Sequence, residues 1–200
     1  MDGIIPLVAF TGAGISKQSG IPTFEELDNR HLLTRGFCMG HPKEFYDNLL
    51  MMERSIRDAQ PNAAHLALAE KQIPIITMNI DGLHHKAGSQ RVVEIHGSLR
   101  KVHCRRCKQD YPFRQIEEGC TCPICGKVFD HDVVLYDDPL PLLSVAQRMV
   151  AQAKELLVVG TSFYTSTSSF VVEYARSYGT RVTIINEDAV KNVPIYLTRF

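Results

Sequence analysis

Residues 4–16 read IIPLVAFTGAGIS, and this stretch decides the fold of the chain. Its first seven residues are apolar, and such a run directly before a glycine turn predicts a buried β-strand. In the turn, Gly12 and Gly14 allow a tight bend and a close approach of the backbone to a pyrophosphate. Because Lys17 stands where the full dinucleotide-binding pattern has a third glycine, the turn also fits a plain strand-to-helix connection.

Further apolar runs predict strands, and each ends in small or polar residues: 73–78, 92–95, 156–159 and 181–185. Helical patterns occur at residues 42–58, 62–71, 140–154 and 168–178. Apolar strands that alternate with helices predict a Rossmann-like, doubly wound parallel α/β sheet that is covered on both faces. Its ligand would bind beyond the carboxyl ends of the strands, near the point where the strand order reverses.

The chain has 200 residues, with 22 acidic and 22 basic side chains. This length fits one domain with a small inserted module. The charge balance argues against a nucleic-acid partner, and we interpret the basic residues 100–108 as a solvated surface. Because no apolar run is long enough to span a bilayer and the N-terminus lacks a secretory signal, we expect a cytoplasmic protein without a membrane partner.

Two Cys-x-x-Cys pairs, separated by fourteen residues, predict a zinc site formed by Cys104, Cys107, Cys122 and Cys125. Such pairs bind one tetrahedral Zn²⁺ through four thiolates, and a site closed in this way is structural. An incidental cysteine cluster is the plainer alternative, and Cys120 is a competing ligand with poorer spacing. We expect residues 99–129 to form a zinc-ribbon module without a convincing strand, inserted into the α/β domain of residues 1–98 and 130–200.

Three polar side chains follow predicted strands and are candidates for chemistry. Asn79 and Asp81 can hydrogen-bond an amide or a ribose hydroxyl, although at a strand end they also cap turns. His96 is a candidate general base because the ordinary pKa of histidine lies near neutral pH, and the alternative is a hydrogen-bonded core histidine. We expect His84 and His131 to be surface or packing residues.

Taken in order along the chain, these motifs resemble those of the sirtuin family. The matching stretches are residues 12–16 (GAGIS), 19–22 (SGIP), 61–65 (PNAAH), 79–84 (NIDGLH) and 95–98 (IHGS). The cysteine module follows the last of them, as it does in the family. The histidine of PNAAH is expected to anchor the start of a helix. The chain departs from the family pattern at Thr23, Glu25, Met78 and Asp137.

The resemblance implies an NAD-dependent protein lysine deacylase that transfers the acyl group to ADP-ribose and releases nicotinamide. Asp81 would hold the nicotinamide amide, Asn79 would position the ribose or a water, and His96 would take a proton from a ribose hydroxyl. The residues implied to bind NAD⁺ are Gly12, Ala13, Gly14, Ser16, Phe24, Met78, Asn79, Ile80, Asp81, Gly160, Thr161, Ser162 and Asn186. For Asn186, a plain role in a strand-end turn is the alternative.

On the substrate side, the resemblance implies that an acylated lysine of a protein or peptide binds along residues 133–136. Val133, Val134 and Tyr136 would face the acyl-lysine channel. The C-terminal helix of the family would be shortened or absent. The departures leave two alternatives open: a mono-ADP-ribosyltransferase or NAD hydrolase of the sirtuin type, and a catalytically weak NAD-binding module.

Overall fold

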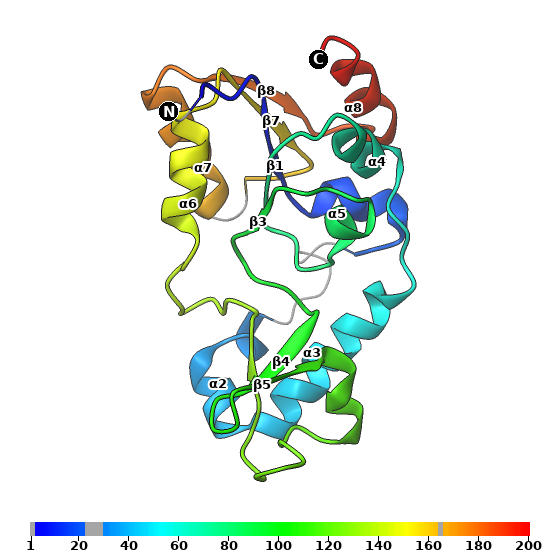
Figure 1. The fold of residues 1–200 in the computed structure, drawn as a ribbon, viewed down its shortest axis with the longest axis vertical. Coiled ribbons are helices and arrows are strands. Elements are labelled where there is room, and N and C mark those ends of the chain that lie inside the picture. The colour runs from blue at the N-terminus through cyan, green and yellow to red at the C-terminus, as the bar shows by residue number, and fades with distance from the viewer. Residues whose placement is uncertain (1–2, 23–29, 164–165) are drawn as a thin grey trace.

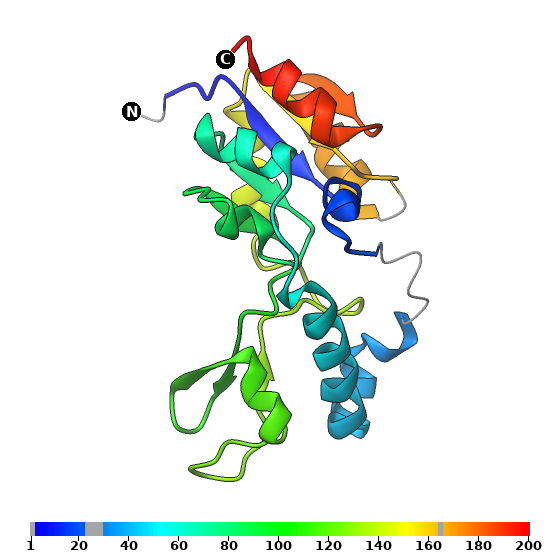
Figure 2. The same cartoon turned by 90° about the vertical axis from the view of Figure 1, so that its right-hand side faces the viewer.

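The computed structural model describes residues 3–22, 30–163 and 166–200, and its chain forms two lobes (Figure 1). The sheet lobe holds a five-stranded sheet, and the small lobe (residues 31–57 and 99–135) holds a three-stranded sheet. Figure 2 shows the small lobe below the sheet lobe, with several extended chain segments joining the two.

The larger sheet is parallel and has the strand order β3-β2-β1-β7-β8. Its strands are β1 (Val8–Thr11), β2 (Ile75–Thr77), β3 (Val92–Glu94), β7 (Glu155–Val159) and β8 (Arg181–Ile185). Thr11 pairs with Thr77 on one side and with Val159 on the other, so three strands end at the same level. The order reverses between β1 and β7, and the doubly wound prediction is confirmed.

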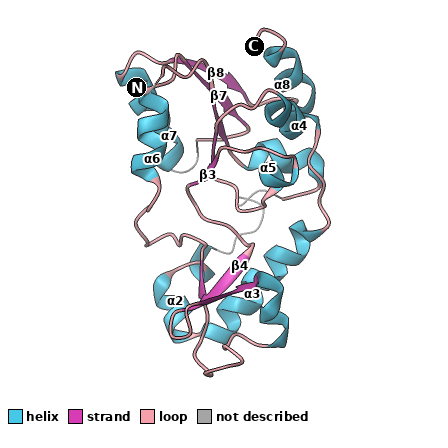
Figure 3. Cartoon of the chain, viewed as in Figure 1, coloured by secondary structure: helices cyan, strands magenta, loops and turns pink. Residues whose placement is uncertain are grey.

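Helices cover both faces of this sheet (Figure 3). One face packs on α6 (Leu143–Ala151) and α7 (Ser166–Ser177), and the other on α4 (Ala63–Glu70) and α8 (Ala189–Leu197). Alternate residues of β1 serve the two cores, with Phe10 facing α6 and α7 and Ala9 facing α4 and α8. Across the described residues, no helix is both long enough and apolar enough to cross a bilayer.

A nine-residue helix, α8, follows β8. The expectation of a shortened or absent family helix stays a prediction. Pro194 lies inside α8, and a proline in a helix interior removes a backbone donor and weakens a sequence-based helix prediction. The helix nevertheless forms because its buried side chains, including Val193 and Leu197, pack against Ala64 and Leu68 of α4. Tertiary burial therefore outweighs the local cost of the proline.

The small lobe combines α2 (Arg35–Gly40) and α3 (Pro42–Arg57) with β4 (Lys101–Cys104), β5 (Gln109–Pro112) and β6 (Asp130–His131). The expectation of no strand in the cysteine module is wrong, because β4 pairs antiparallel with β5 and β6. These strands have four, four and two residues and carry polar side chains, so the sequence contains no apolar run that would predict them.

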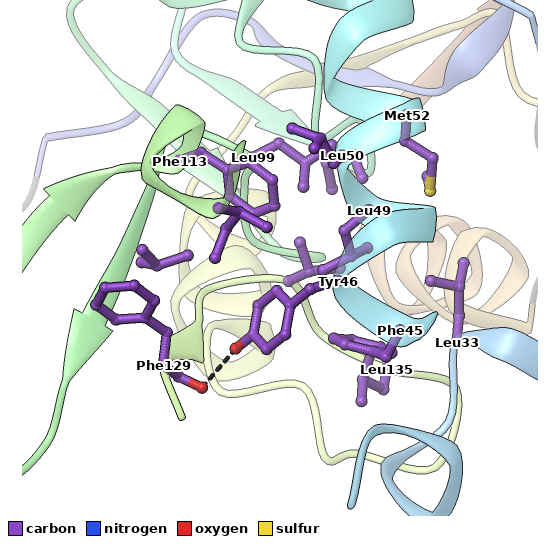
Figure 4. Packing of buried hydrophobic residues seen from close by; sticks show 14 of the residues in the cluster. Leu33, Phe45, Tyr46, Leu49, Leu50, Met52, Leu99, Phe113, Phe129 and Leu135 are labelled. Carbon is purple, nitrogen blue, oxygen red and sulfur yellow. Dashed lines mark hydrogen bonds between the residues drawn. The ribbon is translucent and has the colours of Figure 1, made fainter. Parts of the chain in front are cut away.

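A single hydrophobic core unites α3 with the cysteine module, as Figure 4 shows. Phe45 and Leu49 lie on the apolar face predicted for this helix, and both are fully buried. The Tyr46 hydroxyl donates a hydrogen bond of 2.5 Å to the carbonyl of Phe129. The division of the chain at residues 99 and 129 stays a prediction, but the module and α3 share their packing.

Candidate active site

The glycine turn after β1 meets the turn after β7 at the point where the strand order reverses. The Gly12 and Gly14 amides donate to the carbonyls of Val159 (3.0 Å) and Gly160 (2.8 Å). A Cβ on Gly14 would lie 2.7 Å from the Gly160 Cα. The sequence explained these glycines by the approach of a pyrophosphate. The structure adds a second reason for glycine at these positions, because the two backbone turns are in contact. Both glycine amides donate their hydrogen bonds to carbonyls of the protein.

Ser16 forms hydrogen bonds with Asn79 and Asp81, the two polar residues predicted after β2. It lies in the 3₁₀ segment η1 (Ala13–Ser19) and is 1% exposed. Its Oγ donates to Asp81 Oδ2 at 2.7 Å and accepts from Asn79 Nδ2 at 3.2 Å. Asn79 Nδ2 also lies 3.2 Å from the Gly12 carbonyl, and Asp81 Oδ1 accepts from the Leu83 amide at 2.9 Å. Both predicted residues therefore lie beside the glycine turn.

The loop after β2 also joins the glycine turn to the loop after β3. The Met78 amide donates to the Thr11 carbonyl (3.0 Å), and the Met78 methyl would lie 3.1 Å from a Cβ on Gly12. The Ile80 carbonyl accepts from the amide of Leu99 at 3.3 Å. Residues 78–81 therefore lie between the predicted pyrophosphate turn and the segment that carries His96.

His96 lies where the two lobes meet. Burial lowers the pKa of its ring, and a hydrogen bond to the Met78 backbone works in the opposite direction. The ring is therefore neutral at pH 7, and with one nitrogen engaged by Met78 the other can accept a proton. The carbonyl of His96 accepts from the Val134 amide (2.9 Å), which connects the predicted base to the predicted substrate segment.

A mostly apolar pocket lies beside the Ser16 network. The residues that line it are Ala13, Ser16, Ile21, Pro22, Met52, Ser55, Ile56, Asn79, Ile80, Asp81 and Leu99. The sequence missed the contribution of α3, which supplies Met52, Ser55 and Ile56. The apolar face of that helix was visible in its sequence, but nothing there indicates that its last turns reach the other lobe. His96 is not among the lining residues.

The turn after β7 is held by Asn186. Its Oδ1 accepts from the Thr161 amide (3.1 Å), and its Nδ2 donates to the Thr161 carbonyl (2.7 Å). Gly160 has φ +63°, and a Cβ there would lie 2.2 Å from the Ile15 amide nitrogen. Ser162 is exposed. Asn186 thus shapes the predicted cofactor turn, and its contact with a ribose stays a prediction.

The predicted substrate residues divide between core and surface. Val133 is 6% exposed and packs in the core of the small lobe, and its place along an acyl-lysine channel stays a prediction. Tyr136 is 52% exposed and Val134 is half-buried, as alternation along an extended segment requires. Phe24, together with Thr23 and Glu25, lies outside the described residues.

Two further histidines, His65 and His84, contact residues of the glycine turn and of β1. His65 accepts from the Asn62 amide in a capping box at the start of α4, which confirms its predicted anchoring role. It also lies 3.4 Å from Ser16 Oγ. His84 is 2% exposed, as expected for a packing residue, and its Nε2 lies 2.9 Å from Thr11 Oγ1. The sequence carried no signal for these contacts, because they join residues far apart in the chain.

Comparison with known proteins identifies the family of this chain. A model described as the Sir2 family matches residues 12–166. The chain belongs to the Sir2 family. The NAD-dependent protein deacetylase of Caldivirga maquilingensis is 39% identical over 197 residues, covering 90% of this chain and 77% of the relative. The NAD-dependent protein deacylase of Thermococcus sibiricus is 35% identical over 214 residues, covering 94% and 83%.

Solved structures agree with the Sir2 family assignment. A structure of Sir2 bound to an acetylated peptide has a TM-score of 0.86 and 27% identity, and covers 97% of this chain and 92% of its own. A Sir2 homologue in complex with NAD has a TM-score of 0.84 and 28% identity, and covers 96% and 88%. The sirtuin resemblance of the sequence is confirmed.

The small lobe of this Sir2-family chain carries a candidate metal centre. The sulfurs of Cys104, Cys107, Cys122 and Cys125 all lie within 4.8 Å of one another. Burial raises the pKa of Cys122, but hydrogen bonds from the Ile124 and Cys125 amides, Tyr111 and Cys104 together outweigh it and lower that pKa to about 6. A thiol that ionises this readily suits a Zn²⁺ ligand. Among the described residues Cys120 does not join the group, so the ligand set predicted from spacing is the one that converges.

Proposed function

We propose that this chain is an NAD⁺-dependent protein lysine deacylase, which transfers the acyl group to ADP-ribose and releases nicotinamide. The observation that carries the proposal is the convergence of Ser16, Asn79 and Asp81 beside the glycine turn, with His96 bonded to the adjacent Met78. The names of the relatives, NAD-dependent protein deacetylase and deacylase, support the same activity.

NAD⁺ is a substrate of this reaction, and its glycosidic bond is the one that breaks. In the proposal, the pyrophosphate lies over Gly12, Ala13 and Gly14. Gly160, Thr161, Ser162 and Asn186 hold the adenosine half. The pocket beside Ser16 takes the nicotinamide, whose amide group is held by Asp81 and the backbone near Ile80. Its apolar lining excludes water from the reactive ribose carbon, which would otherwise hydrolyse.

His96 acts as the general base. The acyl oxygen of the substrate bonds to the ribose carbon as nicotinamide leaves. A ribose hydroxyl then gives its proton to the ring nitrogen that Met78 leaves unengaged, and the freed oxygen attacks the acyl carbon. The bond from that carbon to the lysine nitrogen breaks, and one water completes O-acyl-ADP-ribose and the free lysine amine. The lowered pKa of His96 suits this role, because the ring must be neutral to receive the proton. Asn79, held in place by Ser16 and Gly12, positions the ribose or a water.

The acyl-lysine segment of a protein or peptide lies along residues 133–136, with Val134 and Tyr136 toward it. This segment is tied to the base through the bond between the Val134 amide and the His96 carbonyl. The four cysteines would hold one structural Zn²⁺, which cross-links the two knuckles of the small lobe. The balanced charge supports a protein that does not use nucleic acid as a partner.

The experiment mixes purified protein with labelled NAD⁺ and acetyl-, succinyl- and longer acyl-lysine peptides. The proposal expects free nicotinamide, deacylated peptide and O-acyl-ADP-ribose in equal amounts. Label on protein would instead show ADP-ribosyl transfer, and free ADP-ribose without peptide turnover would show hydrolysis. Binding of NAD⁺ without any product would show a binding module.

A further inference from the structure

The Ser16 hydroxyl has one hydrogen to donate and two lone pairs to accept with, and three polar groups surround it. Asp81 Oδ2 at 2.7 Å accepts only, and the amide nitrogen of Asn79 at 3.2 Å donates only. The third neighbour is His65 Nε2, at 3.4 Å. Ser16 is 1% exposed and His65 is fully buried, so water does not compete for these positions.

The opposite side of the His65 ring determines which nitrogen carries the hydrogen. The Asn62 backbone amide, whose hydrogen has a fixed direction, donates to His65 Nδ1 at 3.3 Å. Asn62 Oδ1 lies 3.1 Å from the same nitrogen, but this oxygen already accepts from the Ala64 amide. We therefore assign the ring hydrogen to Nε2, which then donates to Ser16. Burial lowers the pKa of His65 to about 4, so the ring carries a single hydrogen at neutral pH.

Asn62 connects the start of α4 to η1 through its side chain. Its Oδ1 accepts from the Ala64 amide (3.0 Å) and caps α4. Its Nδ2 donates to the Ile15 carbonyl (2.8 Å) and to Ser19 Oγ (3.0 Å), both in η1. The start of α4 is thus bonded to the segment that carries Ser16 at three places, counting the contact from His65.

From this geometry we infer that His65 is a positioning residue, which directs the Ser16 hydroxyl hydrogen to Asp81 and so orients the carboxylate that recognises the nicotinamide amide. With Asn79 and His65 filling both lone pairs of Ser16 Oγ, its hydrogen has Asp81 as its remaining acceptor. Asp81 Oδ1 is held by the Leu83 amide, so both oxygens have a set orientation. The inference rests on the proposed function for the identity of the ligand.

Two substitutions separate this role from helix capping. Glutamine and glutamate at the third helical position both accept from the N-cap amide, so His65→Gln and His65→Glu keep the capping box. Only glutamine can also donate to Ser16. Glutamate places a second acceptor there, which competes with Asp81 for the Ser16 hydrogen. Asn62→Asp is a third variant, since it keeps the cap oxygen and loses the donors to Ile15 and Ser19.

The test measures NAD⁺ and nicotinamide binding by calorimetry, steady-state kcat and KM, and the thermal midpoint of each variant. We expect the affinities of His65→Gln for NAD⁺ and nicotinamide to stay within about threefold of those of the wild type. His65→Glu should bind both ligands about tenfold more weakly at an equal thermal midpoint, which corresponds to the loss of one buried hydrogen bond. The glutamate variant should raise KM for NAD⁺ more than it lowers kcat, and Asn62→Asp should weaken binding in the same direction.

Equal binding by the glutamine and glutamate variants would overturn the inference, as would losses that follow the thermal midpoint alone. Calorimetry measures binding without turnover, so it tests the positioning role of His65 separately from the deacylase function. A wild type that binds NAD⁺ but deacylates nothing would refute the deacylase, and the variants would still decide the role of His65. A wild type that binds neither ligand would refute both.

Discussion

Ser16 Oγ donates a hydrogen bond of 2.7 Å to Asp81 Oδ2, and this bond joins two loops that lie 65 residues apart in the chain. Ser16 follows the central strand β1, and Asp81 follows its neighbour β2. Because parallel strands bring their carboxyl ends to one edge, the bond locks together the first and second loops of that edge. The orientation of the predicted nicotinamide-binding carboxylate therefore depends on a residue of the glycine turn.

Ser16→Ala tests that dependence. The substitution leaves the buried Asn79 amide without this acceptor and the Asp81 carboxylate without this donor. We expect the free energy of unfolding to fall by about 1–3 kcal/mol and NAD⁺ binding to weaken by about tenfold. Chemical denaturation and calorimetry measure the two effects. Ser144→Ala, at an exposed position, is the control and should change neither; unaltered binding by the Ser16 variant would contradict the expectation.

The fold followed from local signals, whereas the details of the site did not. Apolar runs before glycine or polar residues predicted all five strands of the parallel sheet, because strands buried on both faces need such runs. The four cysteines were found because knuckle spacing is a local property. The contacts of His65 and His84 with η1 and β1, and the arrival of α3 at the pocket, depend on tertiary packing, which no spacing in the sequence reports.

The activity should depend on pH through His96. Burial lowers its pKa, so the ring is neutral and able to accept a proton throughout the neutral range. As the pH falls through that lowered pKa, the ring is protonated and kcat/KM should fall, so the acid limb should lie below the ordinary pKa of about 6.5. His96→Gln should remove deacylation while keeping NAD⁺ binding. An acid limb above pH 7 would argue against a buried, neutral base.

Gly97 should tolerate no side chain. Its φ is +76°, and a Cβ there would lie 1.8 Å from the Asp132 carbonyl oxygen, a backbone atom that cannot rotate away. Gly88 has φ +97° with no atom within 4 Å of its Cβ position, so it isolates the backbone strain. We expect Gly88→Ala to cost about 1–2 kcal/mol and Gly97→Ala clearly more, measured by denaturation. Equal losses would show that the approach of Asp132 does not matter.

Zinc content should follow the four converging cysteines. We expect one Zn²⁺ per chain by metal analysis, and Cys122→Ser should lose most of it because four thiolates close the site. Chelation should lower the thermal midpoint, since the metal cross-links the small lobe. Cys38→Ser, outside the cluster, should keep full zinc content. A purified wild type without metal would refute the assignment.

Stability should fall in mild acid because of His84. Burial lowers its pKa to about 3, whereas in the unfolded chain the pKa is ordinary. Between pH 6.5 and pH 3 the unfolded chain therefore binds more protons, and this residue removes up to about 1.4 kcal/mol of stability per pH unit, with no effect above pH 7. His84→Gln should lose less stability than the wild type between pH 7 and pH 5. An identical loss in both proteins would contradict the prediction.

A crystal structure with NAD⁺ bound tests the central claim most directly. The account predicts that an imidazole nitrogen of His96 lies within about 3 Å of a hydroxyl of the nicotinamide ribose, the reach required of a general base. It also predicts that the Asp81 carboxylate meets the nicotinamide amide while still bonded to Ser16. A dinucleotide whose ribose lay far from His96, or whose nicotinamide occupied another pocket, would contradict the account.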